Sequence, residues 1–584
     1  MVSGMLLLLA GCAGISQSGT VSPSPPTTKS PGPNATPSSF FGFIVNQQCS
    51  VSDTAANGSS CNNPEPHSFP GLPLGWSRSL GPGQMKWSEL VKCDPTGSVC
   101  PVPGSACGKA GEGPNGLPCP SNQLVEGCIP NANAPDDPSN CAYVWGVFDF
   151  WTKLFNSHQV DWMYTAFYTP DYLSVRGSRC TGSGKADFGA DPTCVGAADV
   201  CGGQWGFKWG CDPPADIDAV PGSGLADGTN QNFKWFATAF MKHLQQTGEH
   251  IEYWEAWNEP ENCEEWNHRD QPNTDCTALN PGGGPSTGTY PQLLRLTQDA
   301  RTILGNSAPK VLFTSPAMVA DGNAYQTYLP TILKAGGPLF DVIAFHGYYN
   351  SGPPGCPANC PVPEHWVKVW NGLSTAIRTA GQSSKPVVDT EFNWGPRNNV
   401  IDPDMRAAHT ARIYLLQESY YPALARVSWF GEDFPIASPG APGEFWASGA
   451  TNVQDHCTVP DPVQGGYDCP GGLAMRQVAL WTAGATFSGP CTCSHSPNGG
   501  NCSAETPTGI WQCSITRADG SSGLFVWDNT QTIYPCGNSS CGNTSFAVPA
   551  AYKSDWQDLE GNQTSLNGAS TLMIGAKPIL IENQ

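Results

Sequence analysis

The chain has 584 residues, 49 acidic against 28 basic, and a formal net charge of −21 at pH 7. This length is ample for a large core and exceeds one typical domain, and the lack of a basic face excludes nucleic acid as a partner. The 66 Gly, 55 Pro and 20 Trp indicate a loop-rich globular protein with many aromatic surfaces, and the acidic balance favours a neutral polymer over an anionic one as ligand.

The N-terminus, residues 1–12, predicts an export signal. Leu9-Ala10-Gly11-Cys12 follows a short apolar run and resembles a bacterial lipobox, in which Cys12 is lipidated after cleavage. An ordinary signal peptide has a Lys or Arg before the apolar run, and this sequence has none. A start codon placed too far downstream would explain the difference. We expect an extracellular or cell-surface protein that contacts a bacterial membrane only through this lipid. The alternative is an ordinary secretory signal with an incidental Cys12. No other segment predicts a transmembrane helix.

Residues 13–39 are rich in Ser, Thr, Pro and Gly, which predicts a disordered linker. Strand-like and helix-like segments alternate from residue 40 to 484. We expect eight strands, at 40–46, 72–80, 159–167, 250–259, 310–314, 340–346, 385–391 and 425–430. Helices are expected near 230–247, 289–304, 324–334, 364–379, 403–420 and 472–483. This order predicts an α/β fold, a (β/α)8 TIM barrel.

The pattern changes in residues 485–584, where only short β-rich runs occur, at 510–516, 523–528, 545–548 and 577–581. They predict an accessory antiparallel β domain resembling a sandwich. We favour packing support for the barrel as its role over a carbohydrate-binding module, because the segment is short and its Trp residues can serve as core.

The cysteines predict an oxidising compartment. Removing Cys12 from the 25 cysteines leaves an even number, as a set of disulfides requires. No C-x-x-C motif pairs with a second one and the ten His are scattered, so we expect no structural zinc. We expect disulfides to restrain the βα loops that rim a substrate cleft. The loop cysteines are Cys93, Cys100, Cys107, Cys119, Cys128, Cys141, Cys180, Cys194, Cys201, Cys211, Cys263, Cys276, Cys356, Cys360, Cys457 and Cys469.

Two predicted strands end at a glutamate. Glu259 lies in Trp257-Asn258-Glu259-Pro260, and Glu391 ends the run that begins at Lys385. Active sites of (β/α)8 barrels lie at the carboxyl ends of the strands. A retaining glycosidase needs two carboxyl groups about 5–5.5 Å apart, one to protonate the leaving oxygen and one to attack the anomeric carbon. This chemistry needs no metal or organic cofactor.

Several motifs resemble those of clan A glycoside hydrolases, over roughly residues 40–584. These are Trp257-Asn258-Glu259-Pro260, His346-Gly347-Tyr348, Glu391 and Trp429, which look like the signatures of strands four, six, seven and eight. The contexts 254–260 and 340–348 and the closing segment 576–581 are most similar to family 39 and its relatives. The resemblance implies that Glu259 is the general acid/base, with a raised pKa, and Glu391 the nucleophile.

The same resemblance implies roles for four polar neighbours. Tyr348 would donate a hydrogen bond to Glu391, and His346 would join this network or bind a sugar hydroxyl. Asn258 would bind the sugar 2-hydroxyl, and Arg78 would hold Glu391 in its charged form. The alternatives are core packing for Tyr348, a structural role for His346 and an ordinary ion pair for Arg78.

Other residues flank this predicted site. Because side chains alternate along a strand, we expect Asp389 on the same face as Glu391, and Glu255 on the same face as Glu259. Asp389 and Glu255 would either support the catalytic pair or be the true catalytic groups. The candidates for stacking on sugar rings are Trp429, Trp394, Trp266, Trp205 and Trp209; the last two alternatively fill the small core of a Cys-rich loop.

Together these observations predict an exported retaining β-glycoside hydrolase that acts on a plant or microbial polysaccharide or oligosaccharide. Exo action, as in a β-xylosidase, and endo action both remain open. The alternative from another class is a non-catalytic surface protein that binds carbohydrate on a glycosidase barrel.

Overall fold

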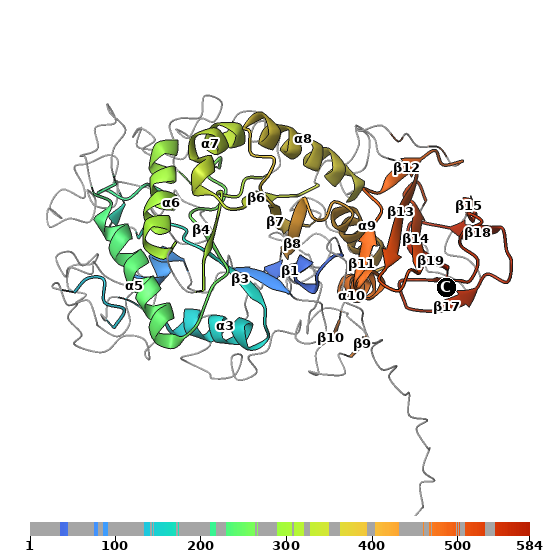
Figure 1. Ribbon diagram of the computed structural model, residues 1–584, viewed down its shortest axis with the longest axis horizontal. Helices are drawn as coiled ribbons and strands as arrows, with labels where there is room; N and C mark the ends of the chain where they lie inside the picture. The colour runs from blue at the N-terminus through green and yellow to red at the C-terminus, as the bar shows by residue number, and fades with distance from the viewer. Residues whose placement is uncertain are drawn as a thin grey trace, which may run out of the picture.

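Eight parallel strands form one sheet, in the order β5-β4-β3-β2-β1-β8-β7-β6 (Figure 1). An isolated parallel bridge between Thr314 and Val342 joins β5 to the chain entering β6, which closes the sheet into a barrel. The strands are β1 (Phe41–Ile44), β2 (Trp76–Ser79), β3 (Asp161–Thr165), β4 (Tyr253–Glu255), β5 (Leu312–Thr314), β6 (Ile343–His346), β7 (Val387–Phe392) and β8 (Leu424–Phe430). The predicted (β/α)8 fold is therefore confirmed.

This computed structural model describes residues 35–44, 75–79, 86–91, 134–139, 143, 145–170, 173–174, 211–217, 229–262, 266, 289–305, 309–319, 328–349, 363–393, 403–430, 459–460, 467–468, 470–497, 499, 502, 508–531 and 544–583. Residues 35–39, directly before Phe40, contact the rest of the fold, since Thr36 N donates to the Ala485 carbonyl over 3.1 Å. The end of the predicted linker thus belongs to the fold.

The helices surround the barrel, as Figure 1 shows. They are α2 (Trp87–Leu90), α3 (Gly146–Ser157), α5 (Gln231–Thr247), α6 (Tyr290–Leu304), α7 (Leu329–Gly336), α8 (Trp366–Thr379), α9 (Pro403–Glu418) and α10 (Pro470–Thr482), with 3-10 turns η1 (Ser38–Phe40), η6 (Gly337–Leu339) and η7 (Pro363–His365). The predicted apolar face of α5 is buried, because its large side chains recur at helical spacing. Sequence reasoning did not predict α2 and α3.

The barrel interior is filled by a separate apolar group that includes Trp76, Met163, Tyr253, Ala344 and Val388. These residues alternate along their strands with residues that face the helices. The carboxyl ends of the strands lie at one end of this apolar group, and the polar residues described below are found there.

The C-terminal region is an antiparallel β domain, as predicted. Its main sheet has seven strands, in the order β11-β13-β14-β19-β16-β17 with β12 paired to β13, and β15 pairs with β18. The strands are β11 (Ala485–Phe487), β12 (Thr492–Ser494), β13 (Ile510–Arg517), β14 (Ser522–Asp528), β15 (Thr544–Ala547), β16 (Asp555–Gln557), β17 (Gln563–Ser565), β18 (Thr571–Ile574) and β19 (Ile579–Asn583). A short antiparallel pair, β9 (Val459–Pro460) and β10 (Tyr467–Asp468), directly precedes α10 in sequence.

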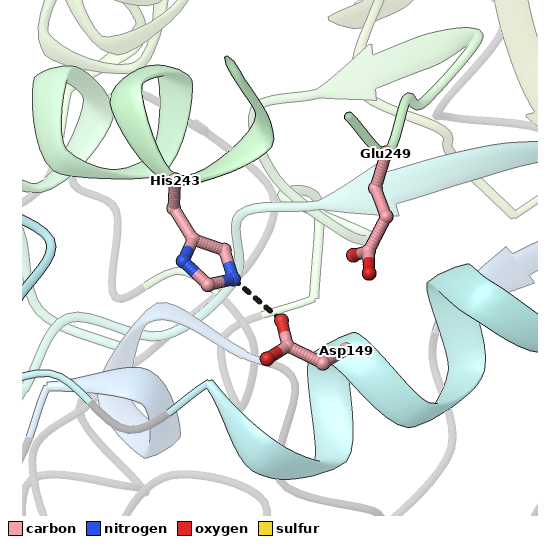
Figure 2. A group of neighbouring side chains, drawn as sticks. All are labelled: Asp149, His243 and Glu249. Atoms are coloured by element: carbon pink, nitrogen blue, oxygen red, sulfur yellow. Dashed lines mark hydrogen bonds and ion pairs between the residues drawn. The ribbon is translucent and has the colours of Figure 1, made fainter. Parts of the chain in front are cut away.

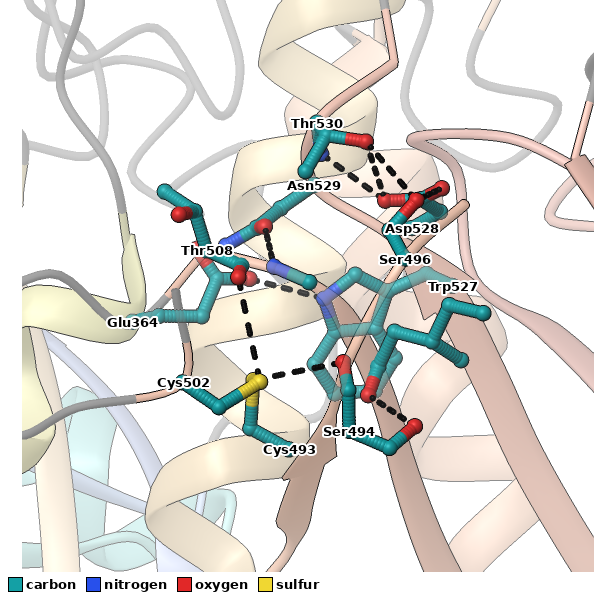
Figure 3. Close-up of a disulfide and its surroundings, with 12 residues drawn as sticks. Glu364, Cys493, Ser494, Ser496, Cys502, Thr508, Trp527, Asp528, Asn529 and Thr530 are labelled. Atoms are coloured by element: carbon teal, nitrogen blue, oxygen red, sulfur yellow. Dashed lines mark hydrogen bonds between the residues drawn. A yellow bond between two sulfur atoms is a disulfide. The ribbon is translucent and has the colours of Figure 1, made fainter. Parts of the chain in front are cut away.

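One face of the main sheet packs on the barrel helices and shares their apolar core. Trp511 and Trp527 stack with ring centroids 6.2 Å apart, and they are 3% and 0% exposed. Trp527 Nε1 donates to Glu364 Oε1 over 2.7 Å (Figure 3). Arg412 holds the same carboxylate through two bonds of 2.8 and 2.7 Å. A buried polar group needs such partners, so this contact fixes how the sheet sits on the barrel.

Two complete disulfides lie in the described residues, Cys491–Cys513 and Cys493–Cys502, and Figure 3 shows the second of them. Both belong to the β domain, and Cys211 is also disulfide-bonded. The other predicted loop cysteines and Cys12 lie outside the described residues. No helix in the described part of the chain has the length and apolarity to cross a membrane.

Candidate active site

Polar side chains from widely separated parts of the chain meet at the carboxyl ends of the barrel strands. Arg78 lies on β2, Glu255 on β4, His346 on β6 and Glu391 on β7. Asn258, Glu259 and Tyr348 follow directly after β4 and β6. The structure thus brings together every polar residue that the sequence predicted for the site.

The loop that carries Glu259 departs from the predicted strand. Regular pairing of β4 ends at Glu255, and beyond it Asn258 forms only an isolated bridge to Ala317. Glu259 adopts a left-handed backbone with φ of 38°, which non-glycine residues rarely adopt. Its N–H donates to the Ala317 carbonyl over 2.9 Å, so the strained turn is held by a defined hydrogen bond.

The two predicted catalytic carboxyl groups face each other. An oxygen of Glu259, an oxygen of Glu391 and a ring nitrogen of His346 all lie within 4.8 Å of one another. The Glu259 side chain is 15% exposed and that of Glu391 4% exposed. These three groups could also hold a cation, although glycoside hydrolysis by two carboxyl groups requires none.

Glu391 is held at both carboxylate oxygens. Arg78 Nη1 donates to Oε1 over 2.5 Å, and the Tyr348 hydroxyl donates to Oε2 over 2.7 Å. Burial raises the pKa of Glu391 above its ordinary value, while His346, Arg78 and the Tyr348 hydrogen bond oppose that rise. Donors that favour the ionised form are what a carboxylate nucleophile needs.

Glu259 has the character of a proton donor. Burial raises the pKa of its carboxyl group to about 7, and Arg78 opposes the rise. His346 Nδ1 lies 2.6 Å from Glu259 Oε1 and 3.4 Å from Glu391 Oε2. Burial lowers the pKa of His346 to about 4, so its ring is neutral at neutral pH and Nδ1 can accept a hydrogen bond from protonated Glu259.

Arg78 organises the rest of the site. Its Nε donates to Glu255 Oε2 over 2.9 Å, its Nη2 donates to the same oxygen, and Nη2 also donates to Asn258 Oδ1 over 2.7 Å. Glu255 is fully buried and accepts further bonds from Thr165 Oγ1 at 2.8 Å and Ala317 N at 3.1 Å. The bond to Asn258 Oδ1 orients its amide, which leaves Nδ2 as the donor for a ligand hydroxyl.

Asp389 does not share a face with Glu391, so that prediction from alternation was wrong. The pairing register of β7 shifts between Asp389 and Phe392, and an extra residue in a strand turns the following side chains over. Asp389 accepts from Gly347 N over 2.9 Å and Trp366 Nε1 over 3.1 Å. A Cβ on Gly347 would lie 2.7 Å from Trp366 Nε1, so this motif requires glycine.

The aromatic residue of β8 beside the site is Phe430 rather than Trp429. Trp429 is 1% exposed, and its ring packs against Phe392 and Tyr414 with centroids 5.3 and 6.2 Å away, on the helix side of the strand. Phe430 lies on the opposite side, with its ring 6.3 Å from Tyr348. Trp429 was predicted from its place on strand eight and its likeness to the strand-eight signature, whereas the alternation of β8 gives the position to Phe430.

Trp266 is also core rather than an open surface. It is 0% exposed and its ring lies edge-on to Trp257, with centroids 4.7 Å apart. The remaining candidates for sugar stacking, Trp394, Trp205 and Trp209, lie outside the described residues.

No protein-family model and no curated protein matches the sequence. Among solved structures, the chain is similar to a GH39 β-xylosidase from Caulobacter crescentus, at 13% identity over 94% of this chain and 97% of that chain, with a TM-score of 0.43. It is similar to the catalytic domain of GH30 xylanase C from Talaromyces cellulolyticus, at 12% identity over 93% and 96%, with a TM-score of 0.43. It is also similar to a glucosidase from Croceicoccus marinus, at 12% identity over 78% of this chain and 85% of that chain, with a TM-score of 0.41.

The GH39 structure represents the family that the sequence motifs resemble. At identities and TM-scores this low, however, the likeness carries no weight for activity. The geometry of the site alone supports the proposal below.

Proposed function

We propose that this chain is a retaining β-glycoside hydrolase. The observation that carries the proposal is the proximity of Glu259 and Glu391, whose carboxylate oxygens lie within 4.8 Å at the ends of different strands. Retaining enzymes hold their carboxyl groups about 5–5.5 Å apart, whereas inverting enzymes separate them by about 6.5–9.5 Å to admit a water. The spacing therefore matches the closer pair of a retaining enzyme.

The two carboxyl groups have environments suited to different tasks. Glu391, held by Arg78 and Tyr348, attacks the anomeric carbon and forms a covalent glycosyl ester. Glu259, whose pKa burial raises to about 7, gives its proton to the leaving oxygen. In the second step the Glu259 carboxylate takes a proton from water, and that water releases the sugar with its β configuration retained.

The surrounding residues support this sequence of steps. His346 contacts Glu259 at 2.6 Å, which fixes the direction in which Oε1 holds or receives its proton. Asn258, oriented by Arg78, offers its Nδ2 to the sugar 2-hydroxyl, a contact that strengthens as the oxocarbenium ion forms. Because the catalytic side chains are largely buried, we infer that each of these groups acts in a water-poor environment where its charge has a large effect.

We infer a neutral β-linked plant or microbial polysaccharide or oligosaccharide as substrate. Exo and endo action depend on the βα loops, most of which lie outside the described residues. The disulfides of the β domain support export, since disulfides form in oxidising compartments. Lipid anchoring at Cys12 is part of the proposal, and mass spectrometry of the mature N-terminus tests it separately: an unmodified or absent Cys12 would contradict it.

A panel of aryl β-glycosides and polysaccharides, with sizing of the products, tests the activity and separates exo from endo action. Glu391→Ala should abolish turnover while the circular dichroism spectrum and the unfolding temperature stay close to wild type. Retained activity in this variant would refute the nucleophile assignment. ¹H NMR of the first-formed product should show the β anomer, and an α product would exclude double displacement. Binding without turnover by the wild type would identify a carbohydrate-binding protein instead.

A further inference from the structure

A second group of possible metal ligands lies in the helical layer outside the barrel (Figure 2). Asp149 comes from α3, His243 from α5 and Glu249 from the turn that leads into β4. One ligand atom from each of the three lies within 4.8 Å of the other two. Glu249 precedes β4 and Glu259 follows it, so this group and the catalytic pair lie at opposite ends of one strand.

Glu249 is the unusual member of the group. It is 8% exposed, and neither carboxylate oxygen has a hydrogen-bond partner among the described residues. Burial, and then the charge of Asp149, raises the pKa of Glu249. Figure 2 shows its carboxylate directed toward the Asp149 side chain. A buried carboxylate without donors is unfavourable unless a cation accompanies it.

The nearest protein cation does not meet this need. Lys153 Nζ lies 3.7 Å from Glu249 Oε1, which is beyond hydrogen-bond distance, and the lysine side chain is 66% exposed. An exposed ammonium on a flexible stem contributes little to an ion pair. It can also move into solvent without disturbing the fold, which leaves the position beside Glu249 available to another cation.

The other two ligands are already oriented. The His243 ring stacks on Trp145, with centroids 4.4 Å apart and planes at 11°, and Trp145 Nε1 donates to the Pro138 carbonyl over 2.9 Å. His243 Nε2 and Asp149 Oδ1 share a hydrogen bond of 2.5 Å, so both ligand atoms already lie side by side, and a bound ion would replace this bond. The Asp149 side chain is 25% exposed, which gives an ion access to the group from solvent.

The turn that carries Glu249 is equally defined. Gly248 ends α5 in the left-handed region with φ of 73°, a conformation that favours glycine, and its N–H donates to the Leu244 carbonyl. The chain therefore reverses immediately after the helix, and Glu249 is placed close to His243.

We propose that Asp149, His243 and Glu249 bind one divalent transition-metal ion, with Zn²⁺ as the best match. One imidazole nitrogen and two carboxylate oxygens form a ligand set that Zn²⁺ accepts, with water as the fourth ligand of a tetrahedron. The ion would neutralise the two carboxylates and join α3, α5 and the start of β4. Its role is therefore structural, and it does not depend on the proposed hydrolase activity.

The sequence predicted no structural zinc, because that prediction relied on paired cysteine motifs and on neighbouring histidines. Here Asp149 and His243 are 94 residues apart in sequence, and only the packing of two helices on the barrel brings them together. Spacing along the chain therefore gives no signal for such a site.

The test uses the full chain, stripped with chelator and then titrated with ZnCl2. We expect one equivalent of zinc by elemental analysis after gel filtration, and saturable heat of binding in calorimetry. At a zinc concentration about 100 times Kd, linkage predicts a rise of about 2 °C in the unfolding temperature of a chain this long. Glu249→Gln and His243→Gln should each weaken zinc binding by roughly 100-fold or more, because each removes a ligand.

Two matched variants show whether the zinc binds at this group. Glu252→Gln changes a carboxylate three residues beyond Glu249 that is not in the group, and it should retain the zinc. Glu391→Gln, in the catalytic pair, should also retain it, which excludes binding at the Glu259–His346–Glu391 group. The proposal is overturned if the purified protein takes up no stoichiometric zinc, or if Glu249→Gln and His243→Gln bind it as the wild type does.

Lys153→Ala separates a metal site from a simple ion pair. If the group serves only to form the ion pair between Lys153 and Glu249, Lys153→Ala should have a lower unfolding temperature, and zinc should not raise it. If a metal binds, Lys153→Ala should keep the stability of the metal-free wild type and bind zinc at least as tightly, because the exposed ammonium contributes little. Weaker zinc binding in Lys153→Ala, or the loss of stabilisation by zinc, would contradict the proposal.

Discussion

Removing the Tyr348 hydroxyl tests how Glu391 is kept ready for attack. The hydroxyl donates to Glu391 Oε2 over 2.7 Å, and Tyr348 is 5% exposed. A hydrogen bond to a buried charged group contributes about 1.5–3 kcal/mol. Tyr348→Phe should therefore lower kcat/KM by about 10- to 150-fold, since about 1.4 kcal/mol corresponds to a tenfold change in rate.

The pH profile gives a second and more specific readout. The donor favours the ionised carboxylate, so its loss raises the pKa of Glu391. The nucleophile must be ionised, and the acidic limb of kcat/KM should therefore move to higher pH. The alkaline limb, set by Glu259 with its pKa of about 7, should stay, so the bell-shaped profile becomes narrower.

Tyr349→Phe is the matched control. Tyr349 is 1% exposed, and its hydroxyl has no hydrogen-bond partner among the described residues. Removing this neighbouring hydroxyl should therefore leave kcat/KM and its pH profile nearly unaltered. The assay is steady-state hydrolysis of the best aryl glycoside from pH 4 to 9. Two results would refute the reasoning: a Tyr348→Phe profile that overlays the wild type, or equal losses in both variants.

Three other described contacts give predictions of their own. Glu259→Gln should remove the alkaline limb and lower the rate by about 10²- to 10⁴-fold for poor leaving groups but far less for activated aryl glycosides; a uniform loss across leaving groups would argue against an acid role. Gly347→Ala should lower the free energy of unfolding by about 1–3 kcal/mol in urea denaturation, because its methyl group would collide with the Asp389 carboxylate; wild-type stability would show that the contact relaxes. Trp527→Phe should lower the free energy of unfolding by about 1–3 kcal/mol, because the buried Glu364 carboxylate loses one hydrogen-bond donor. It should leave kcat/KM at 25 °C unchanged, and an unchanged denaturation midpoint would contradict this prediction.

The sequence predicted the barrel well because its signal is local. Continuous apolar strands and the helical spacing of residues such as Phe233, Phe236 and Phe240 report directly on burial. The strand-end placement of Arg78, Glu259 and Glu391 follows from the fold, since barrel strands present their carboxyl ends at one face.

Other features depend on backbone detail that residue types do not reveal. The register shift in β7 follows Asp389 and turns Glu391 away from the face that Asp389 occupies, and no residue pattern in Val387–Phe392 predicts it. The left-handed turn at Glu259 lies beyond the regular strand, which ends early, at Glu255. The prediction for Trp429 was wrong for a different reason, because it relied on the likeness to the strand-eight signature and did not consider which face of β8 this side chain occupies.

The joint between barrel and β sheet limits how this protein can be divided. Glu364, Arg412 and Trp527 form one interlocked contact, and the apolar residues on both sides belong to a single continuous cluster. A barrel cut off after α10 would leave an ion pair and several aromatic rings facing water. A shortened protein, or a graft of the barrel onto a different partner, should therefore give insoluble fragments unless the contact between barrel and sheet is redesigned as well.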